Sequence, residues 1–327
     1  MVGVVTGRRL LRAAARGGED IRTRYDRGMP DAAHGTLHTA IAASLAAHPA
    51  IARLGAAPLP DPHDVARLAA AFREVAFPGF HPLPRGTDHV DVDAFVADRI
   101  PVLRALLVQL VDACLEAAPT AEGVHDAESI ADAVLARIPD ARAAIAADVE
   151  AAFRGDPAAR SREEVVLCYP GVAALAAHRW AHELWRRGVP VLPRMMAEHM
   201  HGATGIDIHP GAEIGRGVFI DHGTGVVIGE TCRIGDGCRI YQGVTLGAKK
   251  FEREPDGSLR KGTRRHPTLE SNVTVYAGAT ILGGDTVIGA GSVVAGGVFV
   301  TQSVPPGHLV AGPKLQVRVL PTGEDAS

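Results

Sequence analysis

The sequence predicts an α+β protein in which an all-α helical half precedes a parallel β-helix of hexapeptide repeats. Two observations predict it. Residues 34–187 are rich in Ala, Leu, Arg and Glu, and Pro and Gly separate blocks of helical length. After about Gly205 helical spacing ends, and aliphatic residues recur every six positions, often followed by Gly. A six-residue repeat of this kind indicates a solenoid in which each unit supplies a short strand and a turn.

The composition limits the classes of protein that remain. The 327 residues suffice for about two domains, and 46% hydrophobic content provides a sizeable core. A net charge of −3 argues against a dedicated nucleic-acid binder. No apolar run approaches the roughly 18 residues of a membrane span. The four cysteines form no CxxC pair, which fits a reducing compartment. We therefore expect a cytoplasmic protein with no nucleic-acid and no membrane partner.

The change from helical spacing to a six-residue repeat predicts where the domains lie. We expect a flexible N-terminal tail over 1–33, an α-helical domain over 34–200, a β-helix domain over 201–315 and a C-terminal tail over 316–327. Within the helical domain, the predicted helices are Thr36–His48, Asp64–Ala76, Val92–Ala118, Ala127–Ile138, Pro139–Arg154 and Pro170–Arg187.

The last of these helices has the clearest signals. Pro170 suits the first helical position, and Gly188 ends the helix. Apolar residues at helical spacing predict one buried stripe; they are Ala173, Ala177, Trp180 and Leu184.

The hexapeptide repeat predicts roughly four coils with three interruptions. The inward positions are Ile208, Ile214, Ile220, Ile228, Ile234, Ile240, Leu246, Leu269, Val275, Ile281 or Leu282, Ile288, Val294 and Val300. The first interruption is an eight-residue step that contains Asp221-His222-Gly223-Thr224-Gly225. The second is a long excursion over 248–265, and the third is a one-residue slip at Ile281/Leu282. Because loops that interrupt a rigid scaffold tend to carry function, we expect the site there.

Potentially reactive side chains gather at these interruptions. His222 follows Asp221 in the first, Arg265 and His266 end the second, and Asp207 stands where the solenoid begins. Histidine is the usual general base near neutral pH, and a carboxylate can orient it. Asp207 and His222 are 15 residues apart, nearly one coil, so we expect them close together on adjacent coils. A rigid β-helix offers no deep pocket of its own, which favours a site shared between chains.

These residues resemble the serine O-acetyltransferases of cysteine biosynthesis. The resemblance covers roughly Asp148 to Gly312. The motifs that carry it are Asp207-Ile208-His209-Pro210, Asp221-His222-Gly223-Thr224-Gly225-Val226-Val227-Ile228-Gly229-Glu230-Thr231, Val244-Thr245-Leu246-Gly247, Arg265-His266-Pro267 and Ile288-Gly289-Ala290-Gly291-Ser292.

The resemblance implies a left-handed β-helix that forms homotrimers, which can pair into a dimer of trimers. It implies transfer of acetyl from acetyl-CoA to the hydroxyl of L-serine, giving O-acetyl-L-serine, with L-cysteine as a feedback inhibitor. By the same resemblance His222 is the general base and Asp207 its partner, and no metal or permanently bound cofactor is needed. The serine-binding residues would be Asp156, Asp221, Arg265 and His266. The CoA-binding positions would be Gly247, Ala248, Ala277 and Ala290, with backbone N–H groups near Gly247 and Ala248 facing the oxyanion.

The chain departs from the shorter members of that family in four ways. The repeat near Gly283-Gly284-Asp285 is shorter by most of one hexapeptide in that comparison, and the N-terminal helical part is longer, which puts the pairing of trimers in doubt. The 248–265 excursion is much longer and net positive, which suits either a solvated loop or a contact with CoA phosphates. The sequence ends Asp325-Ala326-Ser327, whereas members that dock into the sulfhydrylase end in Ile. We therefore do not expect that complex.

Other functions remain as alternatives. Another hexapeptide acyl-CoA transferase with a different hydroxyl or amine acceptor stays open. A γ-type carbonic anhydrase is disfavoured, because the histidines show no His-x4-His pair of zinc ligands. A scaffold without activity would not need charged pairs at its interruptions. His178 and His182 are expected to pack the helix rather than bind a metal, and Cys232 and Cys238 to fill the solenoid core.

Overall fold

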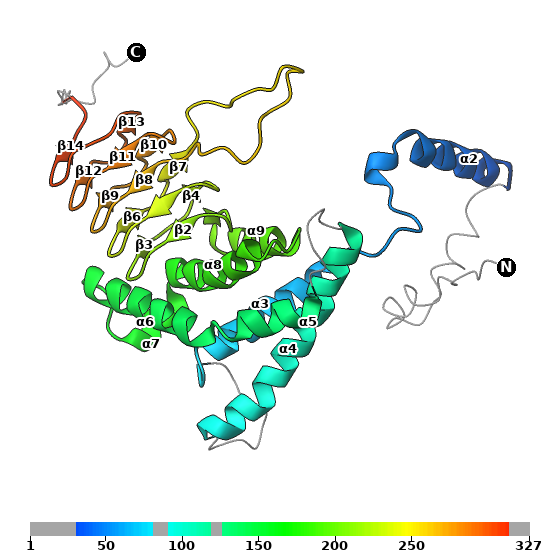
Figure 1. Cartoon of the computed structure of the whole chain (residues 1–327), viewed down its shortest axis with the longest axis horizontal. Coiled ribbons are helices and arrows are strands. Elements are labelled where there is room, and N and C mark those ends of the chain that lie inside the picture. The colour runs from blue at the N-terminus through cyan, green and yellow to red at the C-terminus, as the bar shows by residue number, and fades with distance from the viewer. Residues whose placement is uncertain (1–30, 81–90, 119–125, 314–327) are drawn as a thin grey trace, which may run out of the picture. The chain divides into compact units, whose positions relative to one another are not determined.

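The computed structural model describes residues 31–80, 91–118 and 126–313, shown as coloured ribbon in Figure 1. By its contacts the chain divides into two units, Met1–Ala57 and Pro58–Ser327. In the first unit the described elements are helix α2 (Asp31–Ala47) and the short 3-10 helix η1 (Pro49–Ile51). Nearly all of the expected tail over 1–33, and all of that over 316–327, lie outside the described residues. In the part of the chain that is described, no helix is long and apolar enough to cross a membrane.

The second unit begins with the helical region. Its helices are α3 (Pro62–Ala76), α4 (Val92–Ala117), α5 (Ala127–Leu135), α6 (Ile138–Gly155), α7 (Arg162–Cys168), α8 (Pro170–Arg186) and α9 (Leu192–Thr204). All six predicted helices are present, with ends shifted by a few residues. The sequence pattern did not predict α7 and α9. A signal for α7 was available, because Ser161 accepts a hydrogen bond from the N–H of Glu164 (3.1 Å) in a Ser-x-x-Glu capping pattern.

Helix α8 is buried on two sides rather than along one stripe. Trp180 and Leu184 lie in the core of the helical region, where Trp180 stacks on Phe72 with ring centroids 4.6 Å apart. Ala174 and Leu175, on another side, belong to the core of the solenoid. The helix therefore contributes to both hydrophobic cores and joins them.

A buried ion pair fixes the helices to the first coil. Asp148 of α6 has a side chain only 1% exposed, and Arg179 of α8 donates to both of its carboxylate oxygens over 2.7–2.9 Å. Arg179 also donates to the carbonyl of Gly215 (2.8 Å), and Asp148 accepts from the N–H of Val218 (3.0 Å). Burial raises the pKa of Asp148 to about 6, while Arg179 acts in the opposite direction. Loss of either partner would leave a buried charge, which typically costs about 3–5 kcal/mol.

The remainder of the unit is the predicted parallel β-helix, which confirms the fold class. Three parallel sheets run in the orders β1-β4-β7-β10-β13 (sheet A), β2-β5-β8-β11 (sheet B) and β3-β6-β9-β12-β14 (sheet C). The strands are β1 (Asp207–Ile208), β2 (Glu213–Ile214), β3 (Phe219–Asp221), β4 (Val227–Ile228), β5 (Arg233–Ile234), β6 (Arg239–Tyr241), β7 (Thr245–Gly247), β8 (Thr268–Leu269), β9 (Thr274–Val275), β10 (Thr280–Leu282), β11 (Val287–Ile288), β12 (Val293–Val294), β13 (Phe299–Val300) and β14 (Leu309–Val310).

The solenoid is longer than the predicted four coils. Val304 bridges to Ile288, and β14 pairs with β12, so a further coil follows Val300. At the one-residue slip, the inward position is Ile281. Its side chain is fully buried, whereas that of Leu282 is half-buried. The extra residue of that coil is accommodated in the turn that follows β10.

Three edges of the solenoid position the functional residues. We name them by the sheets they join: the A–B edge holds the turns after β1, β4, β7 and β10, the B–C edge those after β2, β5, β8 and β11, and the C–A edge those after β3, β6, β9 and β12.

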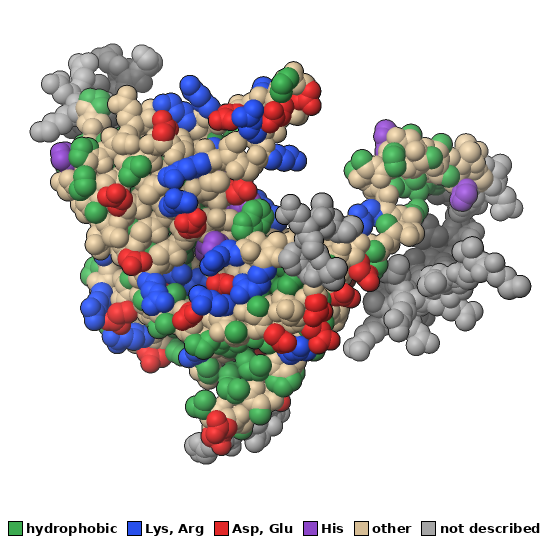
Figure 2. Space-filling view, viewed as in Figure 1, with side chains coloured by type: hydrophobic (Ala, Val, Ile, Leu, Met, Phe, Trp, Pro, Cys, Tyr) green, Lys and Arg blue, Asp and Glu red, His purple; other side chains and the backbone are tan. Residues whose placement is uncertain are grey.

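The predicted excursion leaves from the A–B edge after β7 and returns before β8 (Figure 1). It folds back on itself through an antiparallel bridge between Arg253 and Leu259. Basic and acidic side chains lie close together along it (Figure 2), and Arg260 pairs with Glu252 and Glu254. Part of the positive charge of the excursion is therefore neutralised within the excursion itself.

Candidate active site

His222 projects from the C–A edge at the first interruption of the repeat. It adopts a left-handed backbone conformation (φ 56°), and its side chain is 71% exposed, with Nε2 4.0 Å from Oδ1 of Asp221. Gly223 follows with φ 80°, and a Cβ at this position would lie 2.4 Å from Cδ1 of Ile206. The turn therefore requires glycine, and it presents the imidazole to solvent beside a carboxylate.

Asp156 completes a carboxylate pair near His222. The residue ends α6 and accepts hydrogen bonds from the Tyr169 hydroxyl (2.5 Å) and the N–H of Ala158 (2.8 Å). The Tyr169 hydrogen bond, then that of Ala158, lower the pKa of Asp156, and the charge of His222 adds to the effect. Asp156 is consequently ionised at neutral pH. We call Asp156, Tyr169, Asp221 and His222 the C–A group.

A second group lies on the A–B edge around His266. The His266 side chain is buried (7% exposed), and Nδ1 accepts a hydrogen bond from the N–H of Thr231 (3.1 Å) and lies 2.9 Å from its hydroxyl. Thr231 Oγ1 also accepts from the N–H groups of Arg265 (3.0 Å) and His266 (3.1 Å). A Cβ at Gly229 would overlap the imidazole at 2.1 Å, so glycine makes room for it.

These contacts define the chemistry of His266. Because Nδ1 accepts from the Thr231 N–H, the proton of the neutral ring resides on Nε2. Burial, and then the charge of Arg265, lower the pKa of His266 to about 4. His266 is therefore uncharged at neutral pH and carries its proton on Nε2, where it can donate a hydrogen bond.

The Arg265 guanidinium is held next to His266 by an ion pair with Glu230. Near it, His209 packs edge-on against Trp185 with centroids 4.9 Å apart, and its Nδ1 accepts from the N–H of Gly211 (3.0 Å). Burial lowers the pKa of His209. We call His209, Glu230, Thr231, Arg265 and His266 the A–B group. The sequence pattern placed Glu230 and Thr231 within a motif but gave them no role; the Gly-Glu-Thr that follows the Val-Val-Ile strand was the available signal.

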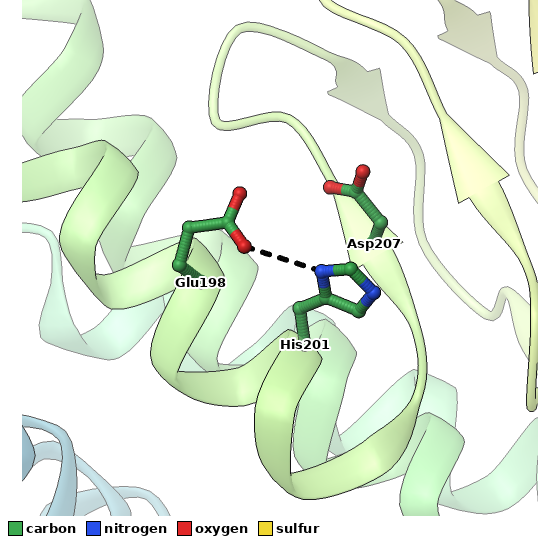
Figure 3. A group of neighbouring side chains, drawn as sticks. All are labelled: Glu198, His201 and Asp207. Carbon is green, nitrogen blue, oxygen red and sulfur yellow. Dashed lines mark hydrogen bonds and ion pairs between the residues drawn. The ribbon is translucent and has the colours of Figure 1, made fainter.

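Asp207 lies on β1, on the outer face of sheet A, and faces α9. Its carboxylate is 3.8 Å from Nη1 of Arg194. Figure 3 shows it beside Glu198 and His201, whose Nδ1 is 3.2 Å from Glu198 Oε2. Ligand atoms of these three residues lie within 4.8 Å of one another, the spacing of a metal site. Arg194 pairs with both carboxylates and already supplies the positive charge that they need.

Among the described residues, Asp207 and His222 form no ion pair within one chain, and their expected closeness stays a prediction. Asp207 pairs in register with Val227, twenty positions later, because the eight-residue step lengthens this coil. His222 falls five positions short of that register and lies on the C–A edge. Asp207 instead meets Arg194, and the carboxylate beside His222 is that of Asp221.

We compared the chain with known proteins of similar sequence and structure. No family model matches. The chain is 44% identical over 263 residues to a plasmid-encoded serine acetyltransferase of Synechococcus elongatus, covering 78% of this chain and 82% of the relative. It is 48% identical over 174 residues to the serine acetyltransferase of Mycobacterium tuberculosis, covering 53% and 72%.

Among solved structures, serine acetyltransferase 1 of Entamoeba histolytica in complex with L-cysteine superposes with a TM-score of 0.65 at 35% identity, covering 75% of this chain and 86% of the other. The chain belongs to the serine acetyltransferase family. The resemblance is thereby confirmed, as is serine acetyltransferase activity, so the alternative acceptors left open by the sequence are set aside.

Serine acetyltransferases use acetyl-CoA, and the structure distributes the expected CoA positions over all three edges. Gly247 ends β7 and Ala248 follows it on the A–B edge, whereas Ala277 lies on the C–A edge after β9. Ala290 lies on the B–C edge after β11, where its N–H donates to Glu270. Gly296 takes the place one coil beyond Ala277, since a Cβ there would meet the Ala277 carbonyl at 3.0 Å.

Proposed function

We propose that this serine acetyltransferase works through His222 as general base, with acetyl-CoA as donor. His222 takes the proton from the L-serine hydroxyl as its oxygen attacks the thioester carbonyl. The new C–O bond forms, the C–S bond breaks, and the proton passes to the CoA sulfur. The single observation that carries this is the exposed imidazole of His222, which is held in a strained turn 4.0 Å from Asp221 and whose charge also acts on Asp156.

The two groups divide the recognition of serine between them. Asp156 and Asp221 offer negative charge to the ammonium group. Arg265, steadied by Glu230, offers a planar donor to the carboxylate. His266 adds an uncharged Nε2–H donor, which suits binding rather than proton abstraction.

The placement of these groups supports a site shared between subunits. His222 lies on the C–A edge and His266 on the A–B edge, with sheet A between them in any one chain. One small amino acid contacts both only if the second edge comes from a neighbour. A homotrimer with cyclic symmetry repeats such a contact three times. In it, the half-exposed Asp207 of one subunit would orient the His222 ring of the next. A dimer of trimers stays a prediction.

Ligand chemistry supports further assignments. Gly247, Ala248 and Ala277 would line the CoA arm, with backbone N–H groups near Gly247 and Ala248 facing the oxyanion. L-Cysteine carries the ammonium and carboxylate of serine, so we expect it to compete at the same site and act as a feedback inhibitor. The cytoplasmic location expected from the unpaired cysteines stays a prediction.

The test replaces one residue from each group. His222→Asn should lower kcat for thiol release from acetyl-CoA plus L-serine by about 10²–10⁴-fold, the usual contribution of a general base. Arg265→Ala should raise the KM for serine by about 10–100-fold while circular dichroism stays unchanged, because a charge-assisted hydrogen bond is lost. Near-normal turnover of folded His222→Asn would refute the base assignment.

A mixing experiment then tests the sharing. The two variants are unfolded together, refolded at equal amounts and assayed at a serine concentration well below the KM of Arg265→Ala, where neither variant alone is active. If each site draws on two chains, about a quarter of the sites combine an intact His222 with an intact Arg265 by random pairing, and activity returns. If mixed oligomers form without any recovery, the shared site is wrong.

A further inference from the structure

Two tyrosines stack on the outer surface of sheet C. Tyr241 ends β6, and Tyr276 directly follows the paired strand β9. Their ring centroids are 5.1 Å apart with an interplanar angle of 19°. Tyr241 is half-buried and Tyr276 is 45% exposed. Neither ring belongs to a hydrophobic core, so packing of the fold does not account for the pair.

The pair continues the row of side chains that begins in the C–A group. Asp221 pairs in register with Tyr241, and the pairing of β6 with β9 places Tyr276 next. In the following coil the row holds Ala295, whose small side chain leaves the outer face of Tyr276 uncovered. Coils are about 4.8 Å apart, so the rings lie roughly 5 and 10 Å from Asp221 along the solenoid.

Toward the first coil, helices cover this row of side chains. Helices α6 and α8 both contact β3, and Tyr169 lies beyond Asp221 and bonds to Asp156. The thioester must come within about 3–3.5 Å of a serine hydroxyl near His222. The rest of a donor so placed would extend toward the later coils, past Tyr241 and Tyr276. The next residue on this edge is Ala277, whose methyl side chain takes up little space.

We propose that Tyr241 and Tyr276 form an aromatic platform that binds the pantetheine arm of the acyl donor. The inference rests on the proposed position of the reacting serine beside His222. The platform adds a surface of side chains that binds the acyl donor, on the C–A edge that also carries His222. Apolar contact with the free ring face supplies the affinity.

Tyr276→Ala should raise the Kd for CoA and the KM for acetyl-CoA by about 10-fold, equivalent to about 1.4 kcal/mol of lost contact. The KM for serine should not change. Tyr276→Phe keeps the ring and should behave as the unchanged protein. The matched control is Phe299→Ala, which removes an exposed aromatic ring (67% exposed) from sheet A in the last coil. Equal effects of Tyr276→Ala and Phe299→Ala, or an unchanged Kd in folded Tyr276→Ala, would overturn the platform.

A truncated donor separates the arm from the nucleotide. With acetyl-pantetheine, which lacks the nucleotide, Tyr276→Ala should still show the 10-fold increase in KM. An effect confined to acetyl-CoA would mean that the rings bind adenine, and altered sedimentation of the variant would mean that they join subunits; either result contradicts the proposal. Measuring CoA binding in His222→Asn keeps the two proposals apart. Retained catalysis there refutes the base, whereas the Tyr276 result depends on binding alone.

Discussion

Thr231 controls what the adjacent histidine can do. Its N–H donates to Nδ1 of His266, and its hydroxyl accepts the backbone N–H groups of Arg265 and His266. The hydroxyl thus orders the segment that ends the excursion. A threonine in a β-helix turn is ordinary by itself, and only its contacts with a residue 35 positions away give it this role.

Replacing Thr231 with Val tests this at nearly constant volume. The two N–H groups lose their acceptor, which costs about 1–3 kcal/mol, so kcat/KM for serine should fall by about 5–100-fold. The fall should appear chiefly in the KM for serine, because Arg265 and His266 bind rather than react. Thr274→Val on the outer surface of sheet C is the control. An unchanged serine KM in Thr231→Val would show that the hydroxyl does not position the pair.

The turn between β3 and β4 is the element on which the base depends. It holds His222 at φ 56° and Gly223 at φ 80°, and Gly223 packs directly over Ile206. The two extra residues of this turn displace His222 from the regular repeat. The local strain is therefore located where the imidazole is needed.

Gly223→Ala should lower stability by about 1–3 kcal/mol and kcat by more than tenfold, because the Cβ meets Ile206 and disfavours the positive φ. Gly257→Ala is a matched control, since this glycine has φ 85° but a Cβ added to it would meet nothing within 4 Å. It should lose stability only through its backbone and keep full kcat. Thermal unfolding and thiol release measure both variants. Equal losses in the two would contradict the role of the packed turn.

At the scale of the whole molecule, buried histidines make stability depend on pH. Burial lowers the pKa of His178, His209 and His266, the last to about 4. An unfolded histidine titrates near 6.5, so below that pH the unfolded chain binds protons that the folded chain does not. Stability is complete above about pH 6.5 and is lost as the pH falls toward 4. Asp148, whose pKa is raised to about 6, acts in the opposite sense as a single group.

Urea unfolding at fixed protein concentration should therefore give a lower free energy of unfolding at pH 5 than at pH 7.5. His266 alone should contribute roughly 2 kcal/mol to the difference. His266→Gln should reduce the pH dependence by about that amount. Equal free energies at the two pH values would contradict the burial of these rings as neutral groups.

Most of the helices and coils could be predicted from short-range patterns in the sequence. Capping residues and Pro/Gly punctuation marked the helices, and the six-residue aliphatic period marked the coils, since both depend on neighbours in sequence. Val304 and β14 were missed because the repeat fades where Pro305 and Pro306 follow. Helix α9 was missed because its polar face leaves few apolar positions, with Leu192, Pro193 and Met196 buried.

The sequence by itself determined the solenoid, the interruptions that carry His222 and His266, and the resemblance on which the family assignment rests. Only the tertiary structure decided which edge each residue occupies. The eight-residue step lengthens the first coil, so Asp207 pairs in register with Val227. The turns fixed by the three sheets place Ala277 on the C–A edge and Ala290 on the B–C edge. The number of residues between two positions does not by itself tell which edge each occupies. That depends on the length of every turn between them, which is set by packing.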